Sequence, residues 1–367
     1  MLSNFFHSNY ISMYDFGPQH PLKPVRLART MELLNRYGVE SVDPGIGSDV
    51  NEFDPGLRFE KELLRVHDAE YVEVVKALSL GQVTADPYQY GLAKGDTPHF
   101  RGMFDAALAY TACTVEAAKR VAAGAPIAFA IGGGLHHAHR NRASGFCVFN
   151  DASVACDILL EKFDRVAYVD IDVHHGDGVQ WMFFDDPRVL TCSIHEEGRT
   201  LFPGTGGLHE TGAAHTSLNV PIQARTTGDV WLSAFLRTIP LAVEKFGAQA
   251  IVLQLGTDTH EADPLGHVRC RQQDWLAAVR EVASWKLPIV AVGGGGYNLT
   301  TVPRMWASAC LTLGGQEFDD RIPKDLADKW NMPTFSDAPS ETREIGKEYA
   351  DGVVDWLLEN HVPQIGR

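Results

Sequence analysis

The chain contains four short runs of apolar residues rich in β-branched side chains, at Ile127–Ile131, Val166–Val169, Ile251–Leu255 and Ile289–Val292. Each run is nearly uniformly apolar, which is typical of a strand buried on both faces of a parallel sheet. Stretches with helical spacing lie around these runs, at Phe104–Val121, Ala152–Lys162, Val230–Lys245 and Gln273–Trp285. This alternation of strand and helix predicts an α/β domain with a mostly parallel sheet.

A polar or glycine-rich segment follows each run immediately. The four segments are Gly132–His139, Asp170–Gly178, Gly256–His260 and Gly293–Asn298. Ligands of open α/β sheets bind at the carboxyl ends of the strands, so these four ends can converge on one site. Because such a site cannot be divided by a linker, we expect residues 1–367 to form a single domain. We expect the chain after about residue 314 to wrap this core with helices such as Glu341–Glu359.

Composition narrows the class of protein. The 367 residues are 45% hydrophobic and 22% charged, the proportions of an ordinary globular protein. The net charge of −15 argues against a nucleic-acid partner, because such binding needs a basic surface that displaces counterions. The sequence has no run of about 18 apolar residues, so we expect no membrane span.

The cysteines and the N-terminal segment bear on the compartment. The six cysteines are scattered, without a C-x-x-C pair, and resemble neither a zinc ribbon nor a disulfide framework. Residues Met1–Tyr14 lack a basic segment followed by an apolar one, so we expect no signal peptide. A reducing, cytoplasmic location is the simplest interpretation.

The segment Asp170–Gly178 holds the densest group of chemically active side chains. Asp172 and His174 lie two residues apart, and on an extended chain such residues project to the same side. A carboxylate and an imidazole presented together suit a divalent transition ion such as zinc. Asp258, the first carboxylate after its own apolar run, is the best third ligand, although a helix cap or turn residue is the alternative. An Asp-His-Asp set also leaves iron, cobalt or manganese open.

Two further segments supply candidates for acid–base chemistry and for carbonyl polarisation. His136 and His137 are a natural proton-transfer pair, and Asp170 and Asp177 could each hold one ring N–H; the alternative is that the histidines only cap backbone groups. Tyr297 follows four glycines and can place its phenol where a carbonyl oxygen develops charge, although packing is the alternative role. The glycine run lacks the G-x-G-x-x-G spacing of a dinucleotide site.

Together these segments resemble the zinc-dependent histone deacetylase family, in the class I-like and bacterial acetoin-utilisation branch of the arginase/deacetylase superfamily. The resemblance extends in order from residue 20 to about residue 306. The matching segments are residues 20–26 (HPLKPVR), 133–138 (GGLHHA), 145–151 (GFCVFND), 170–178 (DIDVHHGDG), 193–195 (SIH), 202–206 (FPGTG), 256–258 (GTD), 263–266 (DPLG) and 293–297 (GGGGY).

The resemblance implies an α/β fold of the arginase/deacetylase type, with a central eight-stranded parallel sheet, and hydrolysis of acyl-lysine amides in a protein or peptide. It implies Zn²⁺ on Asp172, His174 and Asp258, a catalytic pair His136 and His137 backed by Asp170 and Asp177, and Tyr297 on the acyl carbonyl. For the substrate channel and the cavity beneath the metal it implies walls at Phe146 and Phe202, lining residues Gly145 and Leu265, a rim carboxylate at Asp96, and Arg26 in the cavity. It also implies a K⁺ ion near Asp170, Asp172, His174, Ser193 and Ile194.

Three observations qualify this resemblance. Val148 stands where the family commonly has tyrosine. Members of weakened activity carry histidine in place of the catalytic tyrosine; this chain keeps Tyr297, which argues against an acyl-lysine reader without catalysis. The second enzyme hypothesis is an acetylpolyamine or other small-molecule amidohydrolase, which would use an acidic gatekeeper where this chain has the apolar Leu265. The preferred acyl group, the natural substrate and the oligomeric state do not follow from the sequence.

Overall fold

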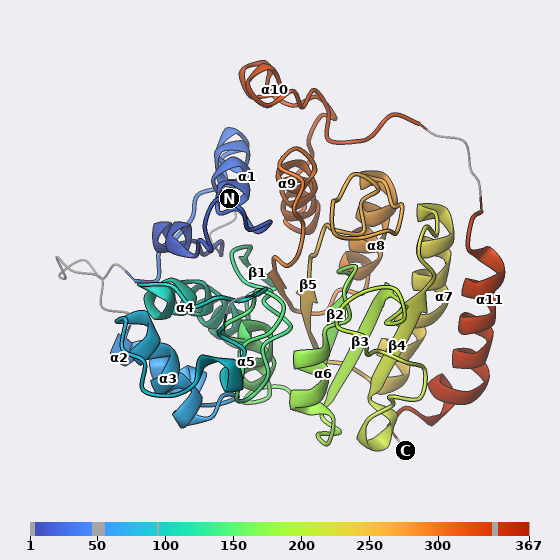
Figure 1. Ribbon diagram of the computed structural model, residues 1–367. Coiled ribbons are helices and arrows are strands. Elements are labelled where there is room, and N and C mark those ends of the chain that lie inside the picture. Colours follow the sequence, from blue (N-terminus) through green and yellow to red (C-terminus); the bar gives the residue numbers. More distant parts are fainter. Residues whose placement is uncertain (1–3, 46–55, 94, 340–343, 367) are drawn as a thin grey trace.

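Six strands form one all-parallel sheet in the order β1-β6-β5-β2-β3-β4. They are β1 (Ile127–Ala130), β2 (Val166–Asp170), β3 (Val189–Glu196), β4 (Ser217–Ile222), β5 (Ala250–Gln254) and β6 (Ile289–Val292). The structure is a computed structural model that describes residues 4–45, 56–93, 95–339 and 344–366. Figure 1 shows the sheet between two layers of helices.

The four apolar runs in the sequence are the strands β1, β2, β5 and β6, with ends that differ by at most one residue. The apolar runs did not predict strands β3 and β4, because polar residues interrupt these two strands. Ser193 in β3 and Asn219 in β4 are buried among apolar neighbours, and Pro221 lies inside β4. Polar side chains in these strands face buried partners, so hydrophobicity alone does not identify them.

The strand count of eight is too high by two for the described residues. Two short segments occupy the positions beyond β1 but pair in parallel at a single residue each, Phe5 with Phe129 and Phe6 with Val42. The N–H of Phe6 donates to the carbonyl of Phe129 at 2.8 Å, and the N–H of Val42 donates to Phe5 at 2.8 Å. The chain then turns into the 3₁₀ helix η1 (Asn9–Met13), so the pairing stops before a strand is established.

Helices cover both faces of the sheet (Figure 1). The first layer contains α4 (Met103–Ala122), α5 (Asp151–Leu159) and α6 (Asp177–Phe183), and the second is a row of α9 (Thr301–Leu313), α8 (Gln272–Ser284), α7 (Gly228–Phe246) and α11 (Lys347–Trp356). Helix α1 (Val25–Arg36) packs on α9, and α2 (Gly56–Leu63) and α3 (Ala69–Ser79) pack on α4. The shorter elements are η2 (Pro87–Tyr90), η3 (Ala213–His215), α10 (Lys324–Trp330), η4 (Leu357–His361) and η5 (Val362–Gln364).

The predicted helical stretches correspond to α4, α5, α7 and α8, although α5 ends at Leu159 and not at Lys162. The predicted C-terminal helix is α11, which begins at Lys347; its proposed start at Glu341 lies outside the described residues. Among the helices in the described ranges, none combines the length and the apolar composition that crossing a membrane requires.

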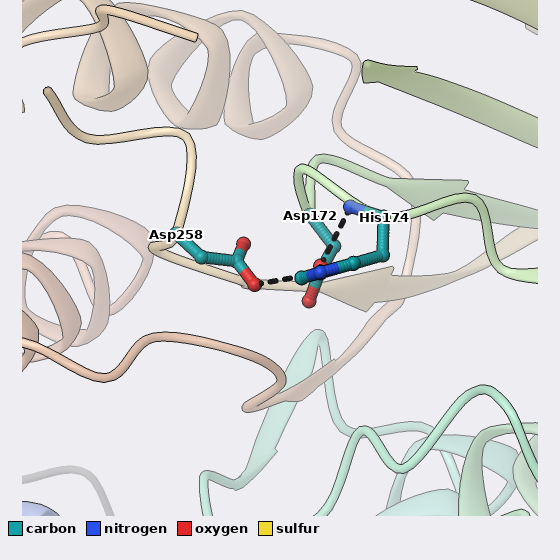
Figure 2. Close-up of side chains that lie close together, drawn as sticks. All are labelled: Asp172, His174 and Asp258. Carbon is teal, nitrogen blue, oxygen red and sulfur yellow. Dashed lines mark hydrogen bonds and ion pairs between the residues drawn. The ribbon is translucent and has the colours of Figure 1, made fainter. Parts of the chain in front are cut away.

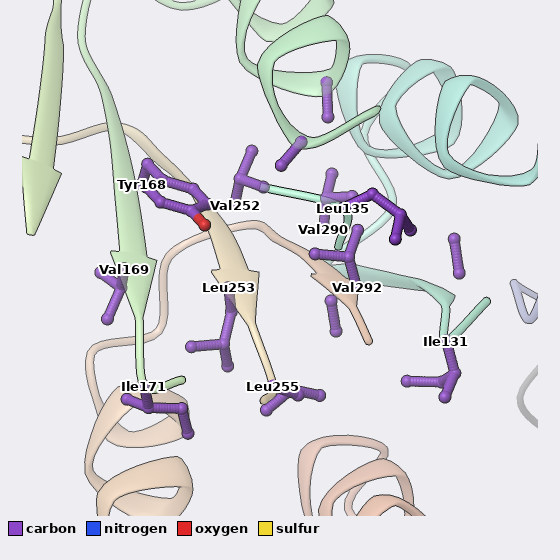
Figure 3. Packing of buried hydrophobic residues seen from close by; sticks show 14 of the residues in the cluster. Ile131, Leu135, Tyr168, Val169, Ile171, Val252, Leu253, Leu255, Val290 and Val292 are labelled. Carbon is purple, nitrogen blue, oxygen red and sulfur yellow. The ribbon is translucent and has the colours of Figure 1, made fainter. Parts of the chain in front are cut away.

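The apolar interior of the sheet explains why the four apolar runs form strands. Side chains such as Val169, Leu253 and Val290 are fully buried between the helical layers, as Figure 3 shows. The topology of the sheet explains where a site can lie. Strands β2 and β5 are neighbours, yet the chain proceeds from β2 to β3 and β4 on one side and from β5 to β6 on the other. Such a reversal opens a crevice at the carboxyl ends of the strands, between the loops after β2 and β5.

Candidate metal centre and active site

The loops after β2 and β5 bring Asp172, His174 and Asp258 together at this reversal (Figure 2). One ligand atom from each residue lies within 4.8 Å of the others. The Nδ1 atom of His174 lies 3.1 Å from Asp172 Oδ1 and 3.0 Å from Asp258 Oδ2. The three residues predicted as ligands therefore form one cluster, and Asp258, although it lies in a turn, directs its side chain into that cluster.

Burial and charge suit this cluster to a cation. Both carboxylates are fully buried. Burial, followed by the nearby Asp172 charge, raises the pKa of Asp258. Burial disfavours the charged form of His174, but the two carboxylates outweigh it and raise its pKa to about 10. Two buried like charges need a positive partner between them, and Asp and His side chains are ligands that a zinc-type ion accepts. The residues therefore fit a divalent metal.

Two neighbours hold the Asp172 carboxylate in place. Gln254, the last residue of β5, donates from Nε2 to Asp172 Oδ2 at 2.8 Å, and the N–H of Gly295 donates to the same oxygen at 2.8 Å. A Cβ atom on Gly295 would lie 2.0 Å from Asp258 Oδ2, so only glycine allows the loop after β6 to approach the two carboxylates.

His136 and His137 extend from the loop after β1 to the same place. Their Nε2 atoms lie 3.0 Å apart, and His136 Nε2 lies 3.9 Å from Asp172 Oδ2. The Nδ1 atom of His136 pairs with Asp170 Oδ2 at 2.8 Å, and that of His137 pairs with Asp177 Oδ1 at 2.6 Å. Each carboxylate accepts a ring N–H and leaves Nε2 directed toward the other histidine.

The two histidines have opposite pKa shifts. Burial lowers the pKa of His136, but the charges of Asp170 and Asp172 outweigh it and raise the pKa to about 9. Burial and the adjacent His136 lower the pKa of His137 to about 4. Burial alone would raise the pKa of Asp177, but the contact with His137 holds it below its ordinary value. Near neutral pH the pair therefore contains one protonated and one neutral imidazole, the arrangement that separates an acid from a base.

Tyr297, on the loop after β6, borders the same cavity as His136 and His137. Burial and the charges of Asp258 and Asp172 raise the pKa of Tyr297 well above its ordinary value, so the phenol stays protonated. Its backbone N–H donates to Asp263 Oδ2 at 2.7 Å. Among the described residues no hydrogen bond engages its hydroxyl, which leaves that group available as a donor.

Gly145 and Phe146 form the tip of a turn beside these groups. Both have positive φ values, 53° and 68°; such a conformation costs a non-glycine residue roughly 1–3 kcal/mol. A Cβ atom on Gly145 would lie 2.4 Å from the His137 ring, so this position has no space for a side chain. The Phe146 ring meets Tyr297 edge to face, with ring centres 5.7 Å apart.

Three other predicted channel residues are positioned differently. Phe202 lies edge to face against His137, with ring centres 4.9 Å apart, and is partly exposed. Asp96 is at the surface, where Oδ2 accepts the N–H of Gly145 at 3.0 Å. Asp263 connects Leu265 to Tyr297: its Oδ1 atom accepts the N–H of Leu265 at 3.0 Å, and its Oδ2 atom accepts the N–H of Tyr297.

Arg26 borders the same small cavity as His136, His137 and Tyr297, together with Leu22 and Cys147. About 20 Å³ of this cavity is open to the centre of a water molecule, which is space for one water. The Nη1 atom of Arg26 donates to the carbonyls of Gly294 and Gly296, both at 2.9 Å. Its Nε atom is buried without a hydrogen-bond partner among the described residues.

Sequence reasoning missed Gln254 and Tyr168, which both support the centre. Tyr168 donates its hydroxyl to Asp170 Oδ2 at 2.6 Å, beside His136. Gln254 carries a signal that was present in the sequence, because it is a polar residue inside an otherwise apolar run.

Of the residues predicted around K⁺, Asp170 and Ser193 lie side by side in the register of β2 and β3.

Comparisons with known proteins agree with this geometry. The profile of the family described as "Histone deacetylase domain" matches residues 20–313. The acetoin utilization protein AcuC of Bacillus subtilis is 38% identical over 344 residues, covering 89% of this chain and 86% of that protein. Histone deacetylase clr6 of Schizosaccharomyces pombe is 33% identical over 97% of this chain and 88% of its own length. Histone deacetylase 9 of Arabidopsis thaliana is 34% identical over 99% of this chain and 87% of its own length. The chain thus belongs to the histone deacetylase family.

Proposed function

We propose that this protein is a zinc-dependent hydrolase that removes acetyl or other acyl groups from lysine side chains of a protein or peptide. The observation that carries the proposal is the buried Asp172–His174–Asp258 cluster, which lies beside a histidine pair with separated pKa values. Membership of the histone deacetylase family supports deacetylation. The donor set supports zinc as the ion, bound by Asp172, His174 and Asp258. When bound, the ion supplies Lewis-acid polarisation of the acyl carbonyl and lowers the pKa of a water molecule.

The chain's own residues move the protons. His137 is neutral near pH 7, so its Nε2 atom can accept a proton from the attacking water. Asp177 accepts the opposite ring N–H and stabilises the imidazolium that forms. His136 stays protonated to a higher pH than His137, so it can donate its proton to the leaving lysine nitrogen as the C–N bond breaks.

Tyr297 stabilises the charge that develops on the acyl oxygen. Its hydroxyl is protonated and has no hydrogen-bond partner among the described residues, so it can donate to that oxygen in the transition state.

Phe146 and Phe202 would flank the lysine alkyl chain, with Gly145 and Leu265 beside them. Asp96 would hold the substrate backbone at the rim. Arg26 would line the cavity that receives the acyl end, and a K⁺ ion near Asp170 and Ser193 would have a structural role.

The remaining parts of the proposal concern the context of the enzyme. We propose that residues 1–367 act as one catalytic domain, because the proposed site draws on the loops of four strands. All six cysteines are free and buried thiols. Free thiols are stable in a reducing compartment, which supports a cytoplasmic location.

The test is a panel of substrates offered to the purified, zinc-loaded enzyme. The panel contains lysine peptides that carry acetyl, propionyl, lactyl, butyryl and octanoyl groups, alongside acetylputrescine and acetylspermidine, with products followed by mass spectrometry. We expect free lysine peptides to be released and a hydroxamate to block their release. Turnover of the polyamines alone would assign the protein to small-molecule metabolism. Absence of all turnover with metal bound would reject the enzymatic proposal.

A further inference from the structure

The turn that carries Phe146 has a conformation that its sequence disfavours. The N–H of Ser144 donates to the carbonyl of Cys147 at 3.1 Å, and the N–H of Cys147 donates back to Ser144 at 2.8 Å. The two residues between them, Gly145 and Phe146, both have positive φ. This is the pattern of a type I′ turn, in which glycine or asparagine ordinarily provides the left-handed residues. Phenylalanine is strained there because its Cβ atom crowds the backbone.

Two side chains from outside the loop hold the backbone of this strained residue. The N–H of Phe146 donates to Thr97 Oγ1 at 2.9 Å, and its carbonyl accepts the Tyr14 hydroxyl at 2.7 Å. The same hydroxyl accepts the N–H of Val148 at 3.1 Å, so one oxygen bridges both sides of Cys147. Tyr14 is buried, and its ring lies edge to face against Tyr110 with ring centres 5.2 Å apart. This packing fixes the position of the hydroxyl.

The held backbone determines where the Phe146 ring lies. The ring meets both Tyr297 and His20 edge to face, with ring centres 5.7 Å and 4.4 Å apart. The turn cannot relax toward His137, because Gly145 already lies against that ring. The position of the Phe146 ring therefore depends on the hydrogen bonds that Tyr14 and Thr97 make.

We infer that Tyr14 is a positioning residue of the active site: its hydroxyl holds Phe146 in the left-handed conformation that places an aromatic wall beside Tyr297. This inference rests on the proposed function, in which Phe146 flanks the lysine alkyl chain. Tyr14 acts through Phe146 and not on the reacting atoms. Its loss therefore weakens substrate binding and leaves the chemical step nearly unchanged.

The test is a double-mutant cycle between Tyr14→Phe and Phe146→Ala, with kcat and KM measured on an acetyl-lysine peptide. Tyr14→Phe removes only the hydroxyl, and we expect KM to rise about tenfold while kcat changes less than about threefold. In the Phe146→Ala background the same substitution should change KM less than about twofold, because the ring through which Tyr14 acts is gone. A crystal structure of Tyr14→Phe should show Phe146 outside the left-handed region.

Tyr71→Phe is the matched control. It removes a buried hydroxyl that donates to the carbonyl of Val148 at 2.6 Å, on the same segment but beyond the turn. We expect it to lower the melting temperature and to leave KM within about twofold of the wild-type value. If Tyr14→Phe does not fold, Thr97→Val removes the acceptor of the Phe146 N–H and should give the same direction of change in KM and the same non-additivity.

The outcomes separate this inference from the proposed function. An unchanged KM in folded Tyr14→Phe, or an equal effect of the substitution with and without the Phe146 ring, overturns the role of Tyr14. A wild-type enzyme that does not hydrolyse acyl-lysine peptides rejects the proposed function. In that case the crystal structure of Tyr14→Phe still decides the inference, because a left-handed Phe146 without the hydroxyl overturns it.

Discussion

The loop after β2 and the loop after β1 both carry proposed catalytic residues, but they are held in different ways. In the short loop after β2, two carboxylates each support a residue two positions further on: Asp170 Oδ1 accepts the N–H of Asp172, and Asp172 Oδ1 accepts the N–H of His174, both at 3.0 Å. The long loop after β1 depends on side chains from elsewhere. Tyr110 on α4 both accepts the N–H of Phe149, at 2.8 Å, and donates to its carbonyl, at 2.9 Å.

The two loops are held differently because they have different proposed roles. Ligand atoms must hold fixed positions relative to one another. The loop after β2 meets part of that need with its own carboxylates, and Gln254 and Gly295 hold Asp172 Oδ2 from neighbouring segments. The proposed channel wall must have a shape that faces a substrate, and Tyr14, Thr97 and Tyr110 hold the loop after β1 from outside it. Substitutions in the first loop should therefore affect metal and chemistry together, whereas those around the second should separate stability, binding and chemistry.

The largest expected effect follows from removing the ligand that joins the β5 loop to the β2 loop. Asp258→Ala removes one of three predicted metal ligands, together with the acceptor of the Val173 N–H at 2.9 Å. We expect bound zinc to fall from about one per chain to below about 0.1, and deacylation to fall by at least about 10³-fold. Metal analysis and kcat/KM test this. Glu261→Ala, which removes an acidic residue from the same loop, should change neither, and full metal content in Asp258→Ala would contradict the assignment.

Tyr297→Phe should lose nearly as much activity while keeping its metal. The substitution removes only the hydroxyl, so the transition state loses one hydrogen-bond donor and kcat should fall about 10²–10³-fold. His137→Ala should show the same combination of lost turnover and retained metal. Full activity in either variant, measured at saturating peptide, would remove that residue from the proposed mechanism.

Gln254→Leu tests whether support for the β2 loop from its neighbouring strand matters. Without the amide that holds Asp172 Oδ2, zinc affinity should fall about 10–100-fold, while kcat with saturating zinc stays within about threefold of the wild-type value. Competition with a chelator of known affinity measures the first quantity. Gln272→Leu provides a control, because Gln272 is equally buried but donates to Ser308 on α9, away from the metal cluster.

Tyr110→Phe should have the smallest effect on catalysis. It removes two hydrogen bonds to the backbone of Phe149, which should lower the free energy of unfolding by about 1–3 kcal/mol in a urea titration. Both kcat and KM should stay within about twofold of the wild-type values. Loss of activity without loss of stability would mean that the loop after β1 does not separate these roles.

The same contrast explains which parts of the molecule could be predicted. Asp172 and His174 follow from local spacing after an apolar run, and the strands β1, β2, β5 and β6 follow from uniform hydrophobicity. The partners of the β1 loop do not have such a signal. Tyr14 contacts the carbonyl of a residue 132 positions away, and a tyrosine between Met13 and Asp15 carries no local sign of that partner. Strands β3 and β4 were missed for a related reason, since their buried polar side chains have partners that only the fold reveals.

The measurement that tests the central claim most directly is a zinc titration of the chelator-stripped enzyme with an acetyl-lysine peptide as substrate. The account predicts no turnover without metal and a linear return of activity that ends at about one equivalent of Zn²⁺ per chain. Asp258→Ala should not respond over the same range. Full turnover by the stripped enzyme, or a wild-type protein that binds zinc and never hydrolyses the amide, would contradict the claim that these loops form a metal-dependent deacylase centre.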